Sequence, residues 1–245
     1  MLNVECFPRR VFPTESRFHP PSAILYLRLV HCIVTAGPTY ETMDNVRRLT
    51  NFSTGRLGTE LANFLTAQGH DVTLLLGEQA TYAGERKAQR VEKFTTTANL
   101  AEKFRSLAGQ KVGAIFHAAA VSDFTFGKIW ERSASGGLSE IKSGKISTRQ
   151  GTLLAELVPT PKIIAELRSL YCGAKLVGWK YEVDGDRAGV LRAAESQLRD
   201  CRTNACVANG PAYGPGFGLV TGTGRCEHIR ETSALCEALE KLLHA

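Results

Sequence analysis

Residues 34–58 read VTAGPTYETMDNVRRLTNFSTGRLG, and this stretch decides the fold. A β-branched run at 33–35 stops at Gly37, and apolar residues recur at helical spacing from Leu57 to Leu65. A buried strand that leads through a glycine-containing turn into a helix predicts an anion site, because the first helical turn offers free N–H groups and a partial positive charge. Ser53 and Thr54 are predicted to cap this helix.

The connection between this strand and this helix is long. It holds about a dozen polar residues, where strand-to-helix loops usually have about two to six. Long ordered loops inside compact domains are usually functional, so we expect this one to carry binding residues.

Apolar runs of β type alternate with helical patterns along the rest of the chain. The predicted strands are 30–35, 72–76, 91–94, 112–117, 174–179, 205–208 and 218–220, and the predicted helices are 55–68, 97–107, 160–170, 187–201 and 233–243. Strands separated by helices favour crossover connections. We therefore predict an α/β, Rossmann-like fold with a mostly parallel sheet, helices on both faces, and ligands at the carboxyl ends of the strands.

Residues 123–151 fit no ordinary connection. They are rich in glycine, serine and lysine and show little apolar periodicity, so we predict a long lid loop. Lysines on such a loop would suit a triphosphate, and a surface insertion with solvated lysines is the alternative.

Composition narrows the functional classes. The chain has 245 residues, 43% of them hydrophobic, a formal net charge of +6 and a pI near 9.0, which suits anionic ligands without the Lys/Arg blocks typical of nucleic-acid binding. No apolar run reaches membrane-spanning length. We expect a cytoplasmic protein, with residues 1–27 as a disordered N-terminal extension and residues 28–245 as a single domain. The seven cysteines indicate reduced thiols, with Cys172 among those in apolar runs.

The sequence lacks the motifs of several common nucleotide-binding, catalytic and metal sites. Gly37 is followed by Pro38 and by no further glycine until Gly55, so the dinucleotide motif G-x-G-x-x-G fails. A P-loop is absent, and the pair Tyr171 and Lys175 is interrupted by a glycine. The histidines form no HxxxH or HExxH pattern, so we predict no metal site in the protein itself.

An ordered set of motifs points elsewhere. TAGPT at 35–39, D-x-V-R at 44–47, N-x-S-T-G-R-x-G at 51–58 and AAAVSDF at 118–124 resemble phosphopantothenoylcysteine synthetase, the phosphopantothenate–cysteine ligase of coenzyme A biosynthesis. G-K-I at 144–146, LVPTPKI at 157–163, VGW-x-x-E at 177–182 and V-A-N at 207–209 continue the resemblance in order. The chain is similar to the C-terminal domain of the bifunctional coenzyme A biosynthesis flavoprotein, and we expect a stand-alone form without flavin.

The resemblance implies a reaction. CTP or ATP, with Mg²⁺, activates the carboxylate of 4′-phosphopantothenate as an acyl nucleotidylate and releases pyrophosphate, and the amine of cysteine then attacks. Such a site must neutralise several anions and hold two reactants in line.

The resemblance also implies roles for residues. Asn51 would bind phosphopantothenate and turn over the intermediate, with a helix cap as its alternative role, and Lys145 would stabilise charge while the acyl nucleotidylate forms. Arg47 would bind substrate phosphate across a homodimer interface. The predicted substrate- or nucleotide-binding residues are completed by Gly37, Thr39, His117, Ala118, Ala119, Ala120, Asp123 and Trp179.

Two departures from the family leave alternatives open. The family lysine motif K-I-K-K reads Lys145-Ile-Ser-Thr here, and Lys142 is the alternative alignment. Two lysines of CTP-using members correspond to Gln197 and Cys201, so the choice between CTP and ATP stays open. A catalytically weak nucleotide- or pantothenate-binding subunit is the rival hypothesis, and a nicotinamide reductase is disfavoured.

Overall fold

The computed structural model describes residues 29–147 and 151–244. The extension expected at 1–27 lies outside the described residues. The centre of the molecule is an eight-stranded sheet with the order β13-β12-β11-β10-β6-β1-β4-β5. Its strands are β1 (His31–Ala36), β4 (Asp71–Gly77), β5 (Arg90–Phe94), β6 (Ala114–His117), β10 (Lys175–Tyr181), β11 (Ala205–Asn209), β12 (Phe217–Gly222) and β13 (Arg225–Ile229). The strands from β11 to β5 run parallel, and β12 and β13 are antiparallel, so the predicted mostly parallel α/β sheet is confirmed.

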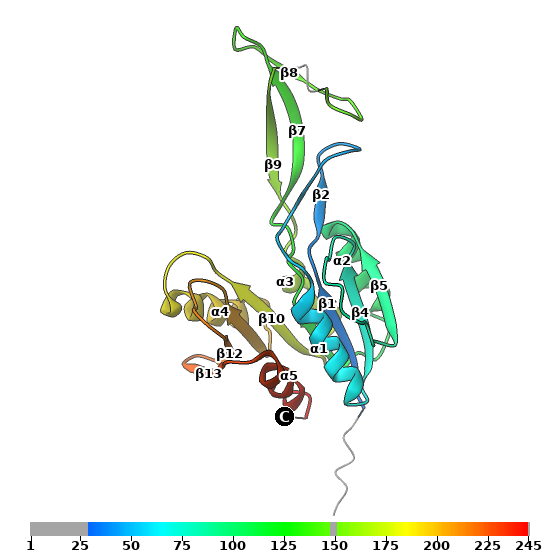
Figure 1. Ribbon diagram of the computed structural model, residues 1–245, viewed down its shortest axis with the longest axis vertical. Coiled ribbons are helices and arrows are strands. Elements are labelled where there is room, and N and C mark those ends of the chain that lie inside the picture. Colours follow the sequence, from blue (N-terminus) through cyan, green and yellow to red (C-terminus); the bar gives the residue numbers. More distant parts are fainter. Residues whose placement is uncertain (1–28, 148–150, 245) are drawn as a thin grey trace, which may run out of the picture.

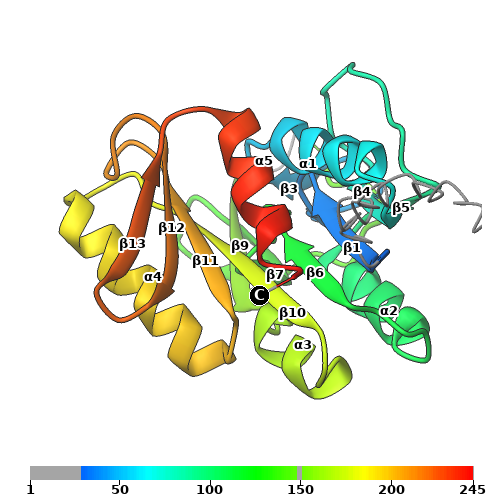
Figure 2. The same cartoon turned by 90° about the horizontal axis from the view of Figure 1, so that it is seen from below.

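Helices cover both faces of this sheet, as Figure 2 shows. One face is covered by α1 (Arg56–Ala67) and α5 (Thr232–Lys241), and the other by α2 (Thr97–Leu107), α3 (Ile163–Leu170) and α4 (Arg187–Cys201). Strand β1 is buried on both sides: Val34 packs in the α1/α5 layer and Ile33 in the α2/α3 layer. This two-sided burial explains the continuous apolar run in its sequence.

The connection after β1 is a β-hairpin and not the irregular polar loop expected from its composition. Its strands β2 (Tyr40–Thr42) and β3 (Arg48–Thr50) pair with Tyr40 opposite Thr50. Glu41 is buried and accepts a hydrogen bond from the Thr97 amide at 2.9 Å, so the hairpin is fixed to the start of α2. The loop is long because it contains an element of its own.

Residues 123–151 are also ordered differently from the expected lid loop. In the described part they form β7 (Phe124–Arg132) and β8 (Leu138–Glu140), and with β9 (Thr152–Pro159), which follows, these strands make an antiparallel sheet in the order β8-β7-β9. Figure 1 shows this arm extending far from the main sheet. Most of its side chains are exposed or half-buried, and the sequence therefore lacks the apolar run of a core strand.

Four smaller differences from the expectations are found. Helix α3 begins at Ile163, because β9 extends to Pro159, and β13 was not predicted. Helix α1 has Gly55 at its N-cap, in a left-handed conformation (φ 80°), although the Thr54 hydroxyl still accepts from the Arg56 amide at 3.2 Å. Cys172 is exposed instead of packed in the core. The described cysteines are all free, as predicted.

Membrane insertion through a helix is not indicated by this fold. Within residues 29–147 and 151–244, every helix is too short or too polar to cross a bilayer.

Candidate functional site

Two adjoining clefts open at the carboxyl ends of the parallel strands. The first has a volume of about 870 Å³ and is bounded by the start of α1, the segment after β6 and the ends of β10 and β11. The second, about 470 Å³, lies between the same segment, the start of α3 and the end of β10. Both clefts are lined by Ala119, Val121, Asp123, Trp179 and Lys180. The β1–β6 boundary, where the chain direction across the sheet reverses, is the expected ligand position in such folds.

The wall between these clefts is the segment 118–123, which is tied to the end of β1. Pro38 and Ala120 form an isolated parallel bridge. The Thr39 amide donates to the Ala120 carbonyl at 3.1 Å, and the Ala120 amide donates to the Gly37 carbonyl at 3.0 Å. The Thr39 hydroxyl accepts from the Ser122 amide at 2.8 Å. Residues 37–39 therefore extend the sheet and set the position of the wall.

Gly37 and Thr39, predicted to bind the nucleotide, are not brought to a cleft. Neither residue lines either cleft, and Thr39 is fully buried with its hydroxyl engaged. Gly37 has φ +81°, and a Cβ there would lie 2.7 Å from the Ala80 Cβ. Both residues support the site from behind, because the TAGPT turn packs against 118–122 and the loop after β4.

Asn51, predicted to bind phosphopantothenate, lines the first cleft. Its side-chain amide donates to the Val121 carbonyl at 3.1 Å, which ties the end of the hairpin to the wall segment. The alternative role as a helix cap does not hold, because the N-cap of α1 is Gly55, four residues later. Asn51 is exposed, so its carboxamide is accessible to a ligand.

The other residues predicted around this wall are brought together. Ala118, Ala119 and Ala120 line the first cleft, and their small side chains leave room for a ligand against the backbone. Asp123 and Trp179 line both clefts. Trp179 is half-buried, with its indole N–H lacking a hydrogen-bond partner among the described residues.

His117 ends β6 and faces the second cleft. Its ring is nearly buried, its Nδ1 lies 3.0 Å from the Thr35 hydroxyl, and it packs edge-on against Phe104. Burial without a neighbouring charge lowers the pKa of His117 to about 4, so the ring is neutral at physiological pH.

Arg47 and Lys145 are not brought to either cleft. Arg47 forms a 2.6 Å ion pair with Asp44 in the hairpin and donates to the Ile146 carbonyl at 3.2 Å. Desolvation alone would raise the pKa of Asp44, but the amides of Val46, Ile146 and Arg47 and the Arg47 charge hold it below its usual value. The hairpin tip is thus hydrogen-bonded to the segment 144–146, in which Lys145 is exposed.

Three polar residues of the clefts were assigned no role from the sequence. Lys180 lines both clefts, and Lys162 lines the second at the start of α3. Asn209 lines the first cleft with its side-chain oxygen buried and without a partner among the described residues. Their positions at the ends of β9, β10 and β11 were the available signal.

The two positions that bear on nucleotide choice have different surroundings. Gln197 lines the second cleft and donates to the Cys206 sulfur at 3.2 Å, whereas Cys201 is buried in the α2/α3 layer. Only the first of these two positions faces a ligand space.

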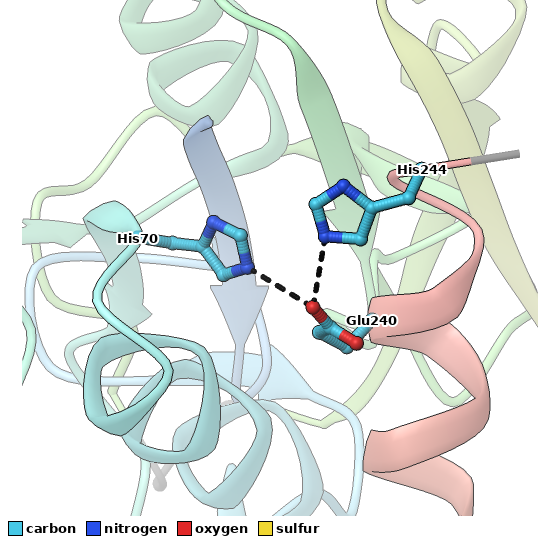
Figure 3. A group of neighbouring side chains, drawn as sticks. All are labelled: His70, Glu240 and His244. Atoms are coloured by element: carbon cyan, nitrogen blue, oxygen red, sulfur yellow. Dashed lines mark hydrogen bonds and ion pairs between the residues drawn. The ribbon is translucent and has the colours of Figure 1, made fainter. Parts of the chain in front are cut away.

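A second polar cluster lies at the opposite end of the sheet, where His70, Glu240 and His244 meet (Figure 3). His244 Nε2 and His70 Nε2 lie 2.9 Å and 3.6 Å from the same Glu240 oxygen. The three groups are close enough to hold a metal ion. However, His70 Nδ1 accepts from the Val30 amide at 3.2 Å, so the proton of the neutral ring belongs on Nε2, the atom that faces Glu240, and a protonated nitrogen is not a metal ligand. The absence of a metal site stays a prediction.

The chain was compared with known proteins. Residues 27–239 match the family model described as DNA/pantothenate metabolism flavoprotein C-terminal domain. The chain belongs to this family. The resemblance read from the motifs is thereby confirmed.

Curated relatives match most of the chain. The "Coenzyme A biosynthesis bifunctional protein CoaBC" of Thermococcus kodakarensis is 32% identical over 200 residues, which are 81% of this chain and 45% of that protein. The same-named protein of Bacillus subtilis is 28% identical over 202 residues, 82% of this chain and 46% of that protein. The chain thus spans about half the length of the curated relatives it matches.

Solved structures share the fold of this family member. The DNA/pantothenate metabolism flavoprotein from Streptococcus pneumoniae superposes with a TM-score of 0.76 at 23% identity, over 88% of this chain and 98% of that one. A Cab2 mutant, H337A, in complex with phosphopantothenate-cysteine gives a TM-score of 0.65 at 19% identity, over 87% of each chain. At these identities the likeness shows the fold alone.

Proposed function

We propose that this chain joins 4′-phosphopantothenate and cysteine into 4′-phosphopantothenoylcysteine, as a ligase of coenzyme A biosynthesis. The observation that carries the proposal is the first cleft, where Asn51, Ala119, Asp123 and Trp179 come together at the carboxyl ends of the strands in a member of this family. The cleft is large enough for a drug-sized ligand.

The chemistry requires activation of a carboxylate. Its oxygen attacks the α-phosphorus of the nucleotide, pyrophosphate leaves, and the cysteine amine then displaces the nucleoside monophosphate from the acyl carbon. Asn51 is the residue we assign to hold phosphopantothenate and the intermediate, because its amide is fixed on Val121 beside the open cleft. Positioning of this kind, with charge stabilisation, supplies most of the rate enhancement in phosphate chemistry.

The nucleotide, CTP or ATP as its Mg²⁺ complex, is assigned to the second cleft, beside the wall that it shares with the first. Asp123, His117 and Trp179 border it, and Lys162 and Lys180 give it an excess of positive charge. The ratio of turnover with CTP and with ATP decides which of the two is the substrate.

We further propose a homodimer built through the arm. Phe124, Leu138, Leu157 and Val158 on the arm are exposed by 39 to 57%, an apolar surface that a second copy of the chain would cover. Arg47 at the tip of the β2–β3 hairpin and Lys145 in the segment after β8 lie near each other, outside both clefts of their own chain. In a dimer they would complete the partner's site, with Lys145 stabilising the charge of acyl-nucleotidylate formation and Arg47 binding substrate phosphate.

The test is an assay of the purified protein for pyrophosphate release. We expect release that depends on phosphopantothenate and on CTP or ATP, followed by cysteine-dependent formation of the amide product. The ratio of turnover with the two nucleotides decides the specificity. No pyrophosphate with either nucleotide would overturn the proposal in favour of a catalytically weak binding subunit.

Two further expectations accompany this function. Residues 28–245 act as a single domain, and the protein works in the cytoplasm, where its substrates and a reduced cysteine pool are found. Deleting residues 1–27 with no loss of turnover would agree with the first, and fractionation of native cells tests the second.

A further inference from the structure

The second cleft is lined by the buried polar side chains of His117, Ser122 and Gln197, and the proposed chemistry gives none of them a specific hydrogen bond to the nucleotide. His117 lies at its floor with only 7% of its surface exposed. Ile163, Ile164 and Phe124 supply apolar walls, and Lys162 and Lys180 supply positive charge. A neutral ring between apolar walls and two ammonium groups is suited to a ligand with hydrogen-bond acceptors and negative charge.

The hydrogen bonds around Thr35 determine which ring nitrogen of His117 carries the proton. The Thr35 hydroxyl oxygen accepts from the Ala119 amide at 3.0 Å and lies 3.0 Å from His117 Nδ1. With the amide proton already donated to this oxygen, the arrangement that uses the hydroxyl proton is donation from Thr35 to Nδ1. Nδ1 is then the acceptor, and the ring proton of the neutral imidazole is on Nε2.

The free edge of the ring therefore presents a donor. Nε2 is not among the buried, unpartnered polar atoms of the described residues, and no protein acceptor for it is seen there, so it meets the space of the cleft. Since burial lowers the pKa of His117 to about 4, this donor is uncharged throughout the physiological pH range. The geometry is that of a preformed hydrogen bond to a ligand.

We propose that His117 Nε2–H donates a hydrogen bond to the nucleoside triphosphate in the second cleft, and that Thr35 is the positioning residue that fixes this tautomer. The proposal rests on the proposed function, because it takes the nucleotide from it. Thr35 has a second task in the same arrangement: it holds the Ala119 amide, and so couples the donor to the wall that both clefts share.

The experiment measures binding of ATP and CTP, each with Mg²⁺, by calorimetry without phosphopantothenate, so that no turnover occurs. Thr35→Val and His117→Leu are expected to raise the Kd of the bound nucleotide about 3- to 10-fold, the loss expected for one neutral hydrogen bond. Thr35→Ser keeps the hydroxyl, and His117→Gln keeps an N–H near the Nε2 position, so both are expected to retain most of the affinity.

A matched control is available on the neighbouring strand. Thr73 on β4 also has a buried hydroxyl bonded to a histidine ring, 3.1 Å from His31 Nε2, but it lines neither cleft. Thr73→Val is expected to leave nucleotide affinity unchanged. Phosphopantothenate binding is expected to change less than twofold in the His117 and Thr73 variants, which a general loss of structure would not allow.

Nitrogen-15 NMR of the His117 ring reads the tautomer directly. We expect a protonated Nε2 and an unprotonated Nδ1 in the wild type at pH 7, and a mixture of tautomers in Thr35→Val. The same binding measurement with inorganic pyrophosphate locates the atom that accepts the hydrogen bond. If His117→Leu leaves pyrophosphate affinity unchanged, the acceptor lies on the nucleoside. If pyrophosphate affinity falls as much as nucleotide affinity, the acceptor lies on the phosphates.

The outcomes separate this inference from the proposed function. A wild type that binds neither nucleotide would overturn both. A wild type that binds a nucleotide, with unchanged affinity in His117→Leu or with the proton found on Nδ1, would overturn the role of His117 alone.

Discussion

Hydrogen bonds to the backbone fix the orientation of a functional side chain at the first cleft. Asn51 illustrates this, because its amide is anchored on the Val121 carbonyl and not at the helix start where a capping asparagine would be. A side chain tied in this way is preorganised for a ligand, since its conformational freedom is already lost before binding.

Replacement of Asn51 is therefore expected to affect turnover more than stability. Asn51→Ala should lower kcat about 100-fold, the scale of losing one positioning or charge-stabilising group, with the urea midpoint nearly unchanged because the residue is exposed. The measurement is product formation with both substrates saturating. Asn63→Ala is the control, since that amide also donates to a carbonyl, of Glu85 at 2.8 Å, but outside both clefts. Equal losses in the two variants would contradict the assignment.

Gly58 lets α1 approach β1 closely enough to form the cleft. A Cβ at Gly58 would lie 2.7 Å from both the Ala36 Cβ and the Thr35 carbonyl oxygen. Gly58→Ala gains up to about 1 kcal/mol of helix propensity but overpacks a buried contact, which typically costs about 1–3 kcal/mol. We expect a net loss in the free energy of unfolding, measured with urea, and a reduced affinity for phosphopantothenate.

The control for Gly58 is Gly109→Ala, because a Cβ at Gly109 meets nothing within 4 Å. It should leave the free energy of unfolding within about 0.5 kcal/mol of the wild type. A Gly58 variant as stable as this control would show that α1 can move away from β1 at little cost.

At the scale of elements, the arm exposes several large apolar side chains to solvent. Leu157 on β9 is 50% exposed, and the arm extends away from the core that could cover it (Figure 1). We expect Leu157→Lys to weaken the proposed homodimer at least about tenfold, as removal of a well-buried apolar contact does. Sedimentation velocity over a concentration series measures this.

Val183→Lys is the comparison for Leu157. Val183 is 59% exposed but follows β10, away from the arm. It should leave the association constant unchanged. If both substitutions act alike, or if the wild type is a monomer at micromolar concentration, the arm is not the dimer interface.

The elements differ in how well the sequence predicts them, and burial explains why. Strands β1 and β4 are packed on both faces, so their apolar runs are visible in the sequence. The strands β7, β9 and β13 are largely exposed, and a run such as RCEHI at 225–229 has no period that separates it from a loop. The motif AAAVSDF, which follows β6, marks a segment that lines both clefts.

The direction of individual side chains was harder to predict. Whether Thr39 faces a ligand or the protein depends on the Pro38–Ala120 bridge, a contact between segments about 80 residues apart. The positions of Arg47 and Lys145 likewise depend on a hairpin and an arm that composition indicated as loops. Sequence patterns give local structure, and these contacts are not local.

For the whole molecule, the cluster in Figure 3 joins the region after α1 to the C-terminal end of the described chain. His70 follows α1, and Glu240 and His244 belong to the C-terminal helix and its end, which packs beside α1. Burial lowers the pKa of His70, and Glu240 opposes this shift. The net effect is a pKa of His70 below its usual value, which favours the neutral ring.

Buried neutral histidines make the stability of the whole fold depend on pH. The pKa of His117 falls from 6.5 to about 4 through burial, so its contribution to stability is fully present above pH 6.5 and is lost as pH falls through about 4. By linkage, this one group accounts for roughly 2 to 3 kcal/mol of the difference in free energy of unfolding between pH 7 and pH 4.5. His117→Leu should lose less stability than the wild type over this interval by about that amount, measured by urea unfolding at both pH values. Equal losses in the two proteins would mean that acid reaches the fold through other groups, and that the His117 ring is hydrated in the native state. The same measurement therefore also tests whether the floor of the second cleft is as dry as the proposed hydrogen bond to the nucleotide requires.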